Sequence, residues 1–421
     1  MKKSTLYTDA DLSQDHVAIS FANGPATDAF GRLRVSAPAT SLLDAQFTYD
    51  LAPLIYEQIT AETGASIAHD ATNRRALMTF SSTPTGGKAY MQSYQHFRYQ
   101  PGKSQAVAIT FNMGAGVANC TKFAGYSDGT NGVEFAMVGT TPTMRILSSS
   151  SLGNQSVEQS SWNIDQLDGT GMSGERLVLD ISKVQIFILD LQALYVGRVR
   201  VGFNINGRDI YVHEFNHANI VAYPYIASAN LPVRCGMTCT GTVSTTMHFN
   251  CAGVVCEGGM DTTVGYRNDV EGTVTASSGA RTHILSVRPK TTFNGIANRS
   301  FFVLKDIALI VTGTNPILWE MVVGQAISGT TTFLDANATY SAFEYNTLGT
   351  ISGNPAIVID SGYVAATNQA KGSADIGLTS KYPITLNAAG AVRSLGTISV
   401  IVTGIGGTSA CRCNLTWEEV R

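Results

Sequence analysis

The sequence predicts an all-β protein: two antiparallel β-sandwich domains that follow an extended N-terminal arm. Three observations support this fold class. Segments with strand-like alternation recur about every 8 to 12 residues, a spacing that is typical of sandwiches. Glycine accounts for 41 of the 421 residues and charged residues make up only 14%, which suits short strands joined by tight turns. No long amphipathic helical pattern interrupts the series.

The clearest predicted element is a β-hairpin over residues 198–215. Apolar residues alternate with other residues over 199–205. Asn206-Gly207 then supplies the positive φ angles of a two-residue hairpin turn, because asparagine and glycine tolerate that conformation. The alternation resumes after the turn, so two antiparallel strands are expected here.

Weaker strand patterns lie on both sides of this hairpin. They cover 106–111, 123–135 with a turn at 128–132, 183–191, 301–312, 317–323, 356–364 and 397–403. We expect the segment 183–191 to be a buried strand, with Val184, Ile186, Ile188 and Asp190 on one side. Only residues 41–60 look partly helical, and Pro53 would limit any helix there to short pieces.

A domain boundary is predicted near Gly258-Gly259, where a dense series of strands gives way to a polar, turn-rich stretch. This divides the chain into an arm over 1–28, a first sandwich over 29–258 and a second over 259–421. The arm has short apolar anchors between polar stretches. We expect it to dock on a neighbouring subunit, where an added strand gains main-chain hydrogen bonds.

Composition excludes several classes of function. The formal net charge is −3, so a basic nucleic-acid-binding surface is not expected. No apolar run approaches the ~18 residues that a spanning helix needs, so no membrane insertion is expected. Low charge on a chain that is 44% hydrophobic indicates surfaces that meet other protein, and hence a homo-oligomer.

The sequence His213-Glu214-Phe215-Asn216-His217 has the form of a zinc-peptidase motif. That motif works on a helix, where one turn brings both imidazoles to one metal ion. Here it continues the second strand of the hairpin. Residues four apart on a strand lie ~13 Å apart, so no catalytic zinc is expected.

The chain has seven cysteines. Four have a spacing that loosely suggests a zinc knuckle or two disulfides: Cys235, Cys239, Cys251 and Cys256. Buried free thiols are the expected state, since free cysteine is a common core residue. A disulfide that forms after release from the cytosol is the alternative. Cys411 and Cys413 share one face of a strand and are expected to pack in the core.

No carboxylate pair, G-x-S-x-G turn or phosphate-binding glycine loop is specified by the sequence. Six aromatic residues could form a sugar-binding shelf or fill the core, and the core is favoured: Tyr90, Tyr94, Phe97, Tyr99, Tyr223 and Tyr225. We therefore expect no catalytic residue, no cofactor-binding residue and no metal ligand. The chain is not expected to be an enzyme or to need a cofactor.

Several segments form a recognisable set when taken in order. They are TDAFGRLRVS over 27–36, FRYQPGKSQ over 97–105, QSSWN over 159–163 with 165–171, GRVR over 197–200 with Gly202-Phe203, HEF over 213–215, and NLPVR over 230–234. This set resembles a family of tailed-bacteriophage virion structural proteins of the tail-fibre-like kind. The resemblance covers about 27–258 and, more loosely, the region that ends at Trp417.

The resemblance implies a structural subunit that assembles with other virion proteins in the host bacterial cytoplasm and resides in the virion. Its implied place is the tail or adsorption apparatus, as a fibre, collar or baseplate-peripheral subunit. A capsid decoration or head-fibre protein is one alternative, and a module that binds a host surface glycan is another. The strand order around the hairpin also looks similar to lectin-like jelly rolls, an analogy of fold that does not identify a ligand.

Overall fold

The computed structural model describes residues 26–34, 39–171, 177–259, 266–355, 357–366, 371–374 and 384–421. Strands account for 56% of the chain and helix for 1%, which confirms the predicted all-β, antiparallel class. The arm predicted over 1–28 lies outside the described residues except for 26–28. Within the described ranges, no helix is long and apolar enough to cross a membrane.

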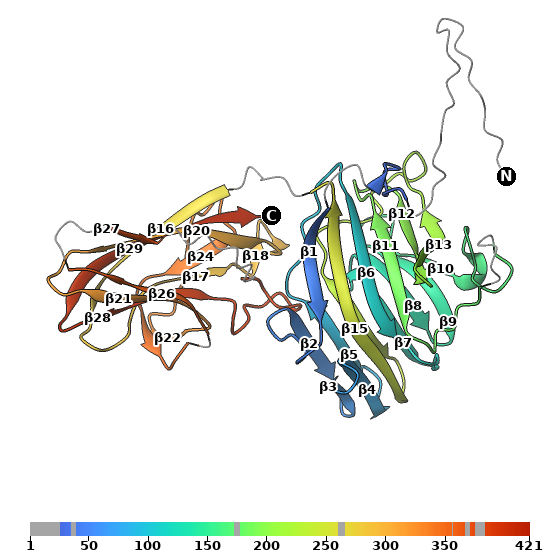
Figure 1. Ribbon diagram of the computed structural model, residues 1–421, viewed down its shortest axis with the longest axis horizontal. Helices are drawn as coiled ribbons and strands as arrows, with labels where there is room; N and C mark the ends of the chain where they lie inside the picture. The colour runs from blue at the N-terminus through green and yellow to red at the C-terminus, as the bar shows by residue number, and fades with distance from the viewer. Residues whose placement is uncertain are drawn as a thin grey trace, which may run out of the picture.

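Two antiparallel sheets packed face to face form the first sandwich (Figure 1). One sheet has the order β13 (Arg208–Phe215), β12 (Val199–Ile205), β11 (Gln185–Leu191), β6 (Ser104–Asn112), β15 (Val243–Glu257), β4 (Arg75–Thr83) and β3 (Ala65–Asp70), with β1 (Ala39–Gln46) also paired to β15. The other has the order β10 (Gln155–Glu158), β9 (Thr141–Leu147), β8 (Gly132–Val138), β7 (Cys120–Ser127), β14 (Val233–Cys239), β5 (Lys88–Ser93) and β2 (Tyr56–Ala61).

Aromatic rings hold the two sheets together. Phe135 on β8 meets Phe203 on β12 edge to face, with ring centroids 5.2 Å apart, and stacks on Phe111 of β6 at 5.9 Å. Phe187 on β11 completes the group, 5.9 Å from Phe203. All four side chains are fully buried. Such offset and edge-on pairs add to the burial of apolar area that stabilises the sandwich.

The predicted hairpin is confirmed. Strands β12 and β13 pair directly, and Asn206 and Gly207 between them have φ angles of 54° and 77°. Positive φ at both central residues is the turn geometry whose twist matches that of the flanking strands.

The helical prediction over 41–60 is wrong, because this segment forms β1 and β2. Strand β1 pairs with β15, about two hundred residues away in the sequence, and β2 pairs with β5. Leu43, Ala45 and Phe47 alternate as buried residues. Pairing with distant strands overrode a weak local preference here.

Ile186, Ile188 and Asp190 lie on one side of β11, as predicted, and this is the outer side of the sheet. Phe187, Leu189 and Leu191 are fully buried, whereas Ile186 is 39% exposed and lies on the outer face. Both faces of this strand are apolar. The alternation therefore defines two faces without showing which one meets the core.

The second sandwich has its own two sheets. One runs β16 (Tyr266–Ala276), β29 (Ser409–Val420), β20 (Phe301–Val311) and β27 (Lys371–Ala374). The other runs β23 (Leu334–Asp335), β24 (Phe343–Asn346), β17 (Thr282–Pro289), β28 (Ile398–Gly404), β21 (Ile317–Val323) and β26 (Ile357–Val364). Two short ribbons, β18 (Thr292–Phe293) with β19 (Ile296–Ala297) and β22 (Ala326–Gly329) with β25 (Gly349–Ser352), complete it.

Buried apolar residues form two clusters, one within 43–254 and one within 270–417. The exact boundary near Gly258-Gly259 stays a prediction, since residues 260–265 lie outside the described ranges. A loop of the second sandwich contacts the first: the Ala388 amide donates to Glu57 at 2.7 Å, and the Arg393 guanidinium lies 4.0 Å from the Tyr94 ring.

Candidate functional site

One end of the first sandwich gathers strand termini from a single sheet. The first residues of β6 and β12 and the last residues of β11, β13 and β15 meet there. Residues 26–34 lie across this end, beside β11 and β12 (Figure 1). The sheet therefore carries a separate chain segment on its outer face.

The segment 26–34 folds as a tight turn built around Asp28. One carboxylate oxygen of Asp28 accepts hydrogen bonds from the amides of Phe30 and Arg32, at 2.9 and 2.8 Å. The other oxygen accepts from the Arg32 side chain at 2.8 Å. Gly31 has a φ of 81°, a conformation that glycine adopts at little cost. A short aspartate at the start of a turn commonly satisfies the amides that follow it.

Backbone contacts fasten this turn to the sheet. The Ala29 amide donates to the Ser104 hydroxyl at the start of β6, at 3.1 Å. Arg198 donates to the Ala29 carbonyl at 2.8 Å, and Arg200 donates to the Thr27 carbonyl at 2.7 Å. The turn is thus hydrogen-bonded to Ser104 at the start of β6, to Arg200 on β12 and to Arg198 just before β12.

A buried cluster of charges lies beneath the turn. The Asp190 carboxylate on β11 accepts from Arg34, from Arg200 and from the Tyr211 hydroxyl. Arg34 also pairs with Glu257 at the end of β15 and donates to the Tyr211 oxygen at 2.9 Å. Two arginines thus face two carboxylates. Such a balance is what makes buried charge tolerable.

The local environment fixes these groups as structural partners. Burial, reinforced by the neighbouring Asp190 charge, raises the pKa of Tyr211 well above its usual range, so the hydroxyl keeps its proton. Burial also raises the pKa of Glu257. The Arg200 guanidinium lies 4.4 Å over the Tyr211 ring, which partly replaces the water that its face has lost.

The loop between β11 and β12 reverses the chain sharply. Ala193, Leu194 and Tyr195 are consecutive residues with φ angles of 38°, 43° and 60°. Left-handed conformations cost about 1–2 kcal/mol for each residue other than glycine. Hydrogen bonds hold the reversal: the Gly197 amide donates to Ala193 at 2.7 Å, and the Tyr225 amide donates to Tyr195 at 2.8 Å.

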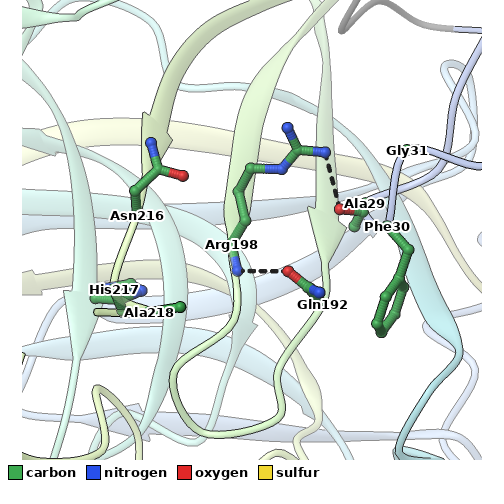
Figure 2. Close-up of a pocket in the computed structure, with 8 residues that line it drawn as sticks. All are labelled: Ala29, Phe30, Gly31, Gln192, Arg198, Asn216, His217 and Ala218. Carbon is green, nitrogen blue, oxygen red and sulfur yellow. Dashed lines mark hydrogen bonds between the residues drawn. The ribbon is translucent and has the colours of Figure 1, made fainter. Parts of the chain in front are cut away.

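This reversal places Gln192 beside Arg198, and the two residues border a surface pocket of about 360 Å³. The Arg198 amide donates to the Gln192 side-chain oxygen at 3.0 Å, as Figure 2 shows. The remaining lining residues are Ala29, Phe30, Gly31, Asn216, His217 and Ala218. None of the lining residues is acidic. One wall therefore belongs to the docked turn and the opposite wall to the chain that follows β13.

The two histidines of the zinc-like motif occupy different surroundings. His213 lies on β13, and its Nδ1 accepts from the Asn163 amide at 3.2 Å. His217 lies beyond the strand, with Nδ1 2.9 Å from the Gly197 carbonyl oxygen and Nε2 3.1 Å from the Gln155 amide nitrogen. Burial lowers the pKa of both imidazoles. The ring nitrogens of the two histidines thus form hydrogen bonds with neighbouring protein groups.

All seven cysteines are free thiols. Cys235, Cys239 and Cys256 are buried, and burial raises the pKa of Cys235 well above its usual range. Cys411 and Cys413 are buried in the second core, as predicted. In the part of the chain that the structure describes, no group of three or more histidine, cysteine or acidic side chains could hold a metal ion.

The six aromatic residues do not form a single shelf. Phe97, Tyr99 and Tyr225 are buried, Tyr90 and Tyr94 are partly buried, and Tyr223 is 55% exposed. The core interpretation thus holds for half of the set.

No pattern in the sequence predicts the pocket in Figure 2. Asn216 lies in the motif over 213–217, and Phe30 and Arg198 lie in segments of the recognisable set, but none of these patterns predicts a pocket. Phe30 comes beside the other lining residues only through the docking of residues 26–34. A turn at Asp28 and an isolated Asp190 in an apolar strand were the available hints. Neither shows that the two segments are neighbours.

Comparison with known proteins identifies no family. No family model matches the chain, and no curated protein matches it. Solved structures with a similar arrangement include a legume lectin-like domain from Entamoeba histolytica, with 8% identity, a TM-score of 0.31, and coverage of 52% of this chain and 98% of that one. The binding domain of botulinum neurotoxin serotype C1 has 9% identity, a TM-score of 0.32, and coverage of 73% and 79%.

The alginate lyase AlyC3 is a third example, with 8% identity, a TM-score of 0.29, and coverage of 45% of this chain and 78% of that one. Identities and TM-scores this low do not identify a ligand or an activity.

Proposed function

We propose that this chain is a non-catalytic structural subunit of a tailed-bacteriophage particle, in the tail or adsorption apparatus, as a fibre, collar or baseplate-peripheral component. It acts through assembly with other virion proteins and with copies of itself. The proposal joins the sequence resemblance to one structural observation: the segments that carry the resemblance lie together in the fold.

These segments meet around the docked turn. Ala29 of the first segment contacts Ser104 of the second, and Arg198 of the fourth donates to the Ala29 carbonyl. The same gathering extends to the other segments: the Tyr99 amide donates to Asn230 at 3.0 Å, and Asn163 bonds to the backbone of Glu214 at 2.9 Å. Segments far apart in the sequence are therefore in contact in the fold.

A buried anchor for the docked turn suits a protein that works by assembly. The side chains of Asp190 and Arg200 are almost inaccessible to solvent. They hold the turn at 26–34 against the sheet, because Asp190 binds Arg34 and Arg200 donates to the Thr27 carbonyl. The carboxylate of Asp190 is occupied by three donors, which favours a structural role over acid–base chemistry.

The second sandwich offers a surface for subunit contact. Strand β26 lies at the edge of its sheet. Tyr363 and Val358 on this strand are 75% and 45% exposed. An edge strand that presents large apolar side chains is a template for pairing with another chain.

Immunogold electron microscopy tests the proposed place in the particle. Antibody raised against the purified chain should label tails or baseplates of intact particles. Label on the head would contradict the tail assignment and favour the capsid-decoration alternative. Particles that carry no label, and whose dissociated proteins give no signal on a blot, would overturn the proposal as a whole.

A further inference from the structure

We propose that the pocket between the docked turn and the end of β13 binds a pyranose unit of a polysaccharide. This goes beyond a structural role in a particle and holds whether or not that role is correct. The pocket of about 360 Å³ (Figure 2) falls within the range of about 300–1,000 Å³ that is usual for small-ligand sites. The ligand class follows from the atoms that face it.

Internal contacts fix the orientation of both amide side chains. The Gln192 oxygen accepts from the Arg198 backbone amide, so its Nε2 is the group left to donate. The Asn216 nitrogen donates to the Glu214 carboxylate at 3.0 Å, so its Oδ1 is left to accept. A backbone N–H only donates and a carboxylate only accepts, so neither amide can be reversed. Among the described residues, neither remaining atom has a hydrogen-bond partner.

The pocket therefore combines an acceptor with donors. Asn216 offers an acceptor, Gln192 offers a donor, and Arg198 adds guanidinium N–H groups beside its bond to Ala29. A carboxylate or a phosphate diester has only acceptors and would leave the Asn216 oxygen without a partner. Sugar hydroxyls both donate and accept, so neighbouring hydroxyls of one ring can satisfy all three side chains.

Phe30 supplies the apolar part of the site. Its ring is half-buried and lines the pocket, while the Arg32 guanidinium lies 4.7 Å from the ring centroid. An aromatic ring held in place can pack against the apolar C–H face of a sugar with little loss of side-chain entropy. The combination of planar polar groups and one ring is selective for a sugar over a simple anion.

The test is saturation-transfer difference NMR on the full chain. The probes are the methyl pyranosides of glucose, galactose, mannose, rhamnose and N-acetylglucosamine, with inorganic phosphate and acetate in competition. At least one pyranoside should show transfer at a dissociation constant of about 1 mM, a typical weak affinity. Asn216→Ala and Gln192→Ala should each weaken it about 3- to 10-fold, the worth of one neutral hydrogen bond, and Phe30→Ala should abolish it.

Gln58→Ala and Tyr49→Ala are matched controls, since both side chains are exposed and lie outside the pocket. They should leave binding unchanged, and circular dichroism should show every variant folded. Absence of transfer from all the pyranosides would overturn the proposal. So would displacement of the sugar by phosphate or acetate, or binding that survives in the Asn216, Gln192 and Phe30 variants.

Discussion

Asp190 and Arg200 face each other on the neighbouring strands β11 and β12, paired in register, with carboxylate and guanidinium 2.7 Å apart. Their side chains are only 4% and 1% exposed. An ion pair on the outer face of a sheet would ordinarily be solvated. Here the turn at 26–34 covers it, and Arg34 and Glu257 complete the charge balance.

Replacing the shared carboxylate tests this arrangement. Asp190→Asn leaves the buried Arg200 guanidinium without its carboxylate partner and removes one of the two carboxylates that pair with Arg34. We therefore expect the free energy of unfolding to fall by about 3–5 kcal/mol. Urea denaturation followed by circular dichroism measures the change. Glu271→Gln removes one partner of the exposed pair with Arg412 and should cost less than about 1 kcal/mol. Equal effects of the two substitutions would show that the cluster does not stabilise the fold.

Two buried histidines predict loss of stability in acid. Burial lowers the pKa of His96 to about 3 and that of His283 to about 4, from an ordinary 6.5. The unfolded chain therefore binds protons below pH 6.5 that the folded chain does not. Stability should be constant above that pH and fall as the pH drops from about 6.5 toward 4, by up to about 1.4 kcal/mol per pH unit for each histidine.

His283→Gln isolates one contribution to that pH dependence. His283 is bonded to the Ser286 hydroxyl at 2.7 Å, and a glutamine side chain can keep a polar contact without titrating. Urea midpoints measured from pH 7 to pH 4 should fall less steeply in the variant. A slope identical to that of the unchanged protein would mean that His283 is not buried in its neutral form.

The absence of a catalytic zinc stays a prediction that elemental analysis can test. His213 and His217 contact Asn163 and Gly197 respectively, and their rings are separated along the chain by Phe215. Protein purified without chelator should contain no stoichiometric zinc. One zinc per chain that disappears on His213→Ala would contradict this.

The sequence predicted local pairing better than it predicted assembly of distant parts. The hairpin at Asn206-Gly207 follows from turn chemistry and alternation within a few residues, and both are local. The burial of Asp190 depends on residues 26–34, which lie about 150 residues away. No pattern within β11 encodes that neighbour.

The same distinction applies to the candidate site. The motif over 213–217 and the cysteine spacings attracted attention because they are compact patterns. The pocket residues Gln192, Asn216 and Phe30 are ordinary surface residue types, brought together by the left-handed loop 193–195 and by the docked turn. Long-range packing, rather than any local signal, creates the site.

The N-terminal residues test the proposed mode of assembly. We expect deletion of Met1 to Asn23 to leave both sandwiches folded, because the turn that covers Asp190 begins after this segment. Incorporation into particles should fall, and light scattering should show the full chain as an oligomer. A monomeric full chain, together with a truncated chain that is incorporated equally well, would contradict the docking-arm hypothesis.

Quantitative mass spectrometry of purified particles can show directly whether this chain is a structural subunit of the tail. Tailed phage particles should be banded by density, separated from free host protein, and measured against isotope-labelled peptides of this chain and of a capsid protein. We expect a fixed copy number per particle, greater than one, that stays with the tails when heads and tails are separated. A chain that is absent from the banded particles, or present at a variable trace level, would contradict it.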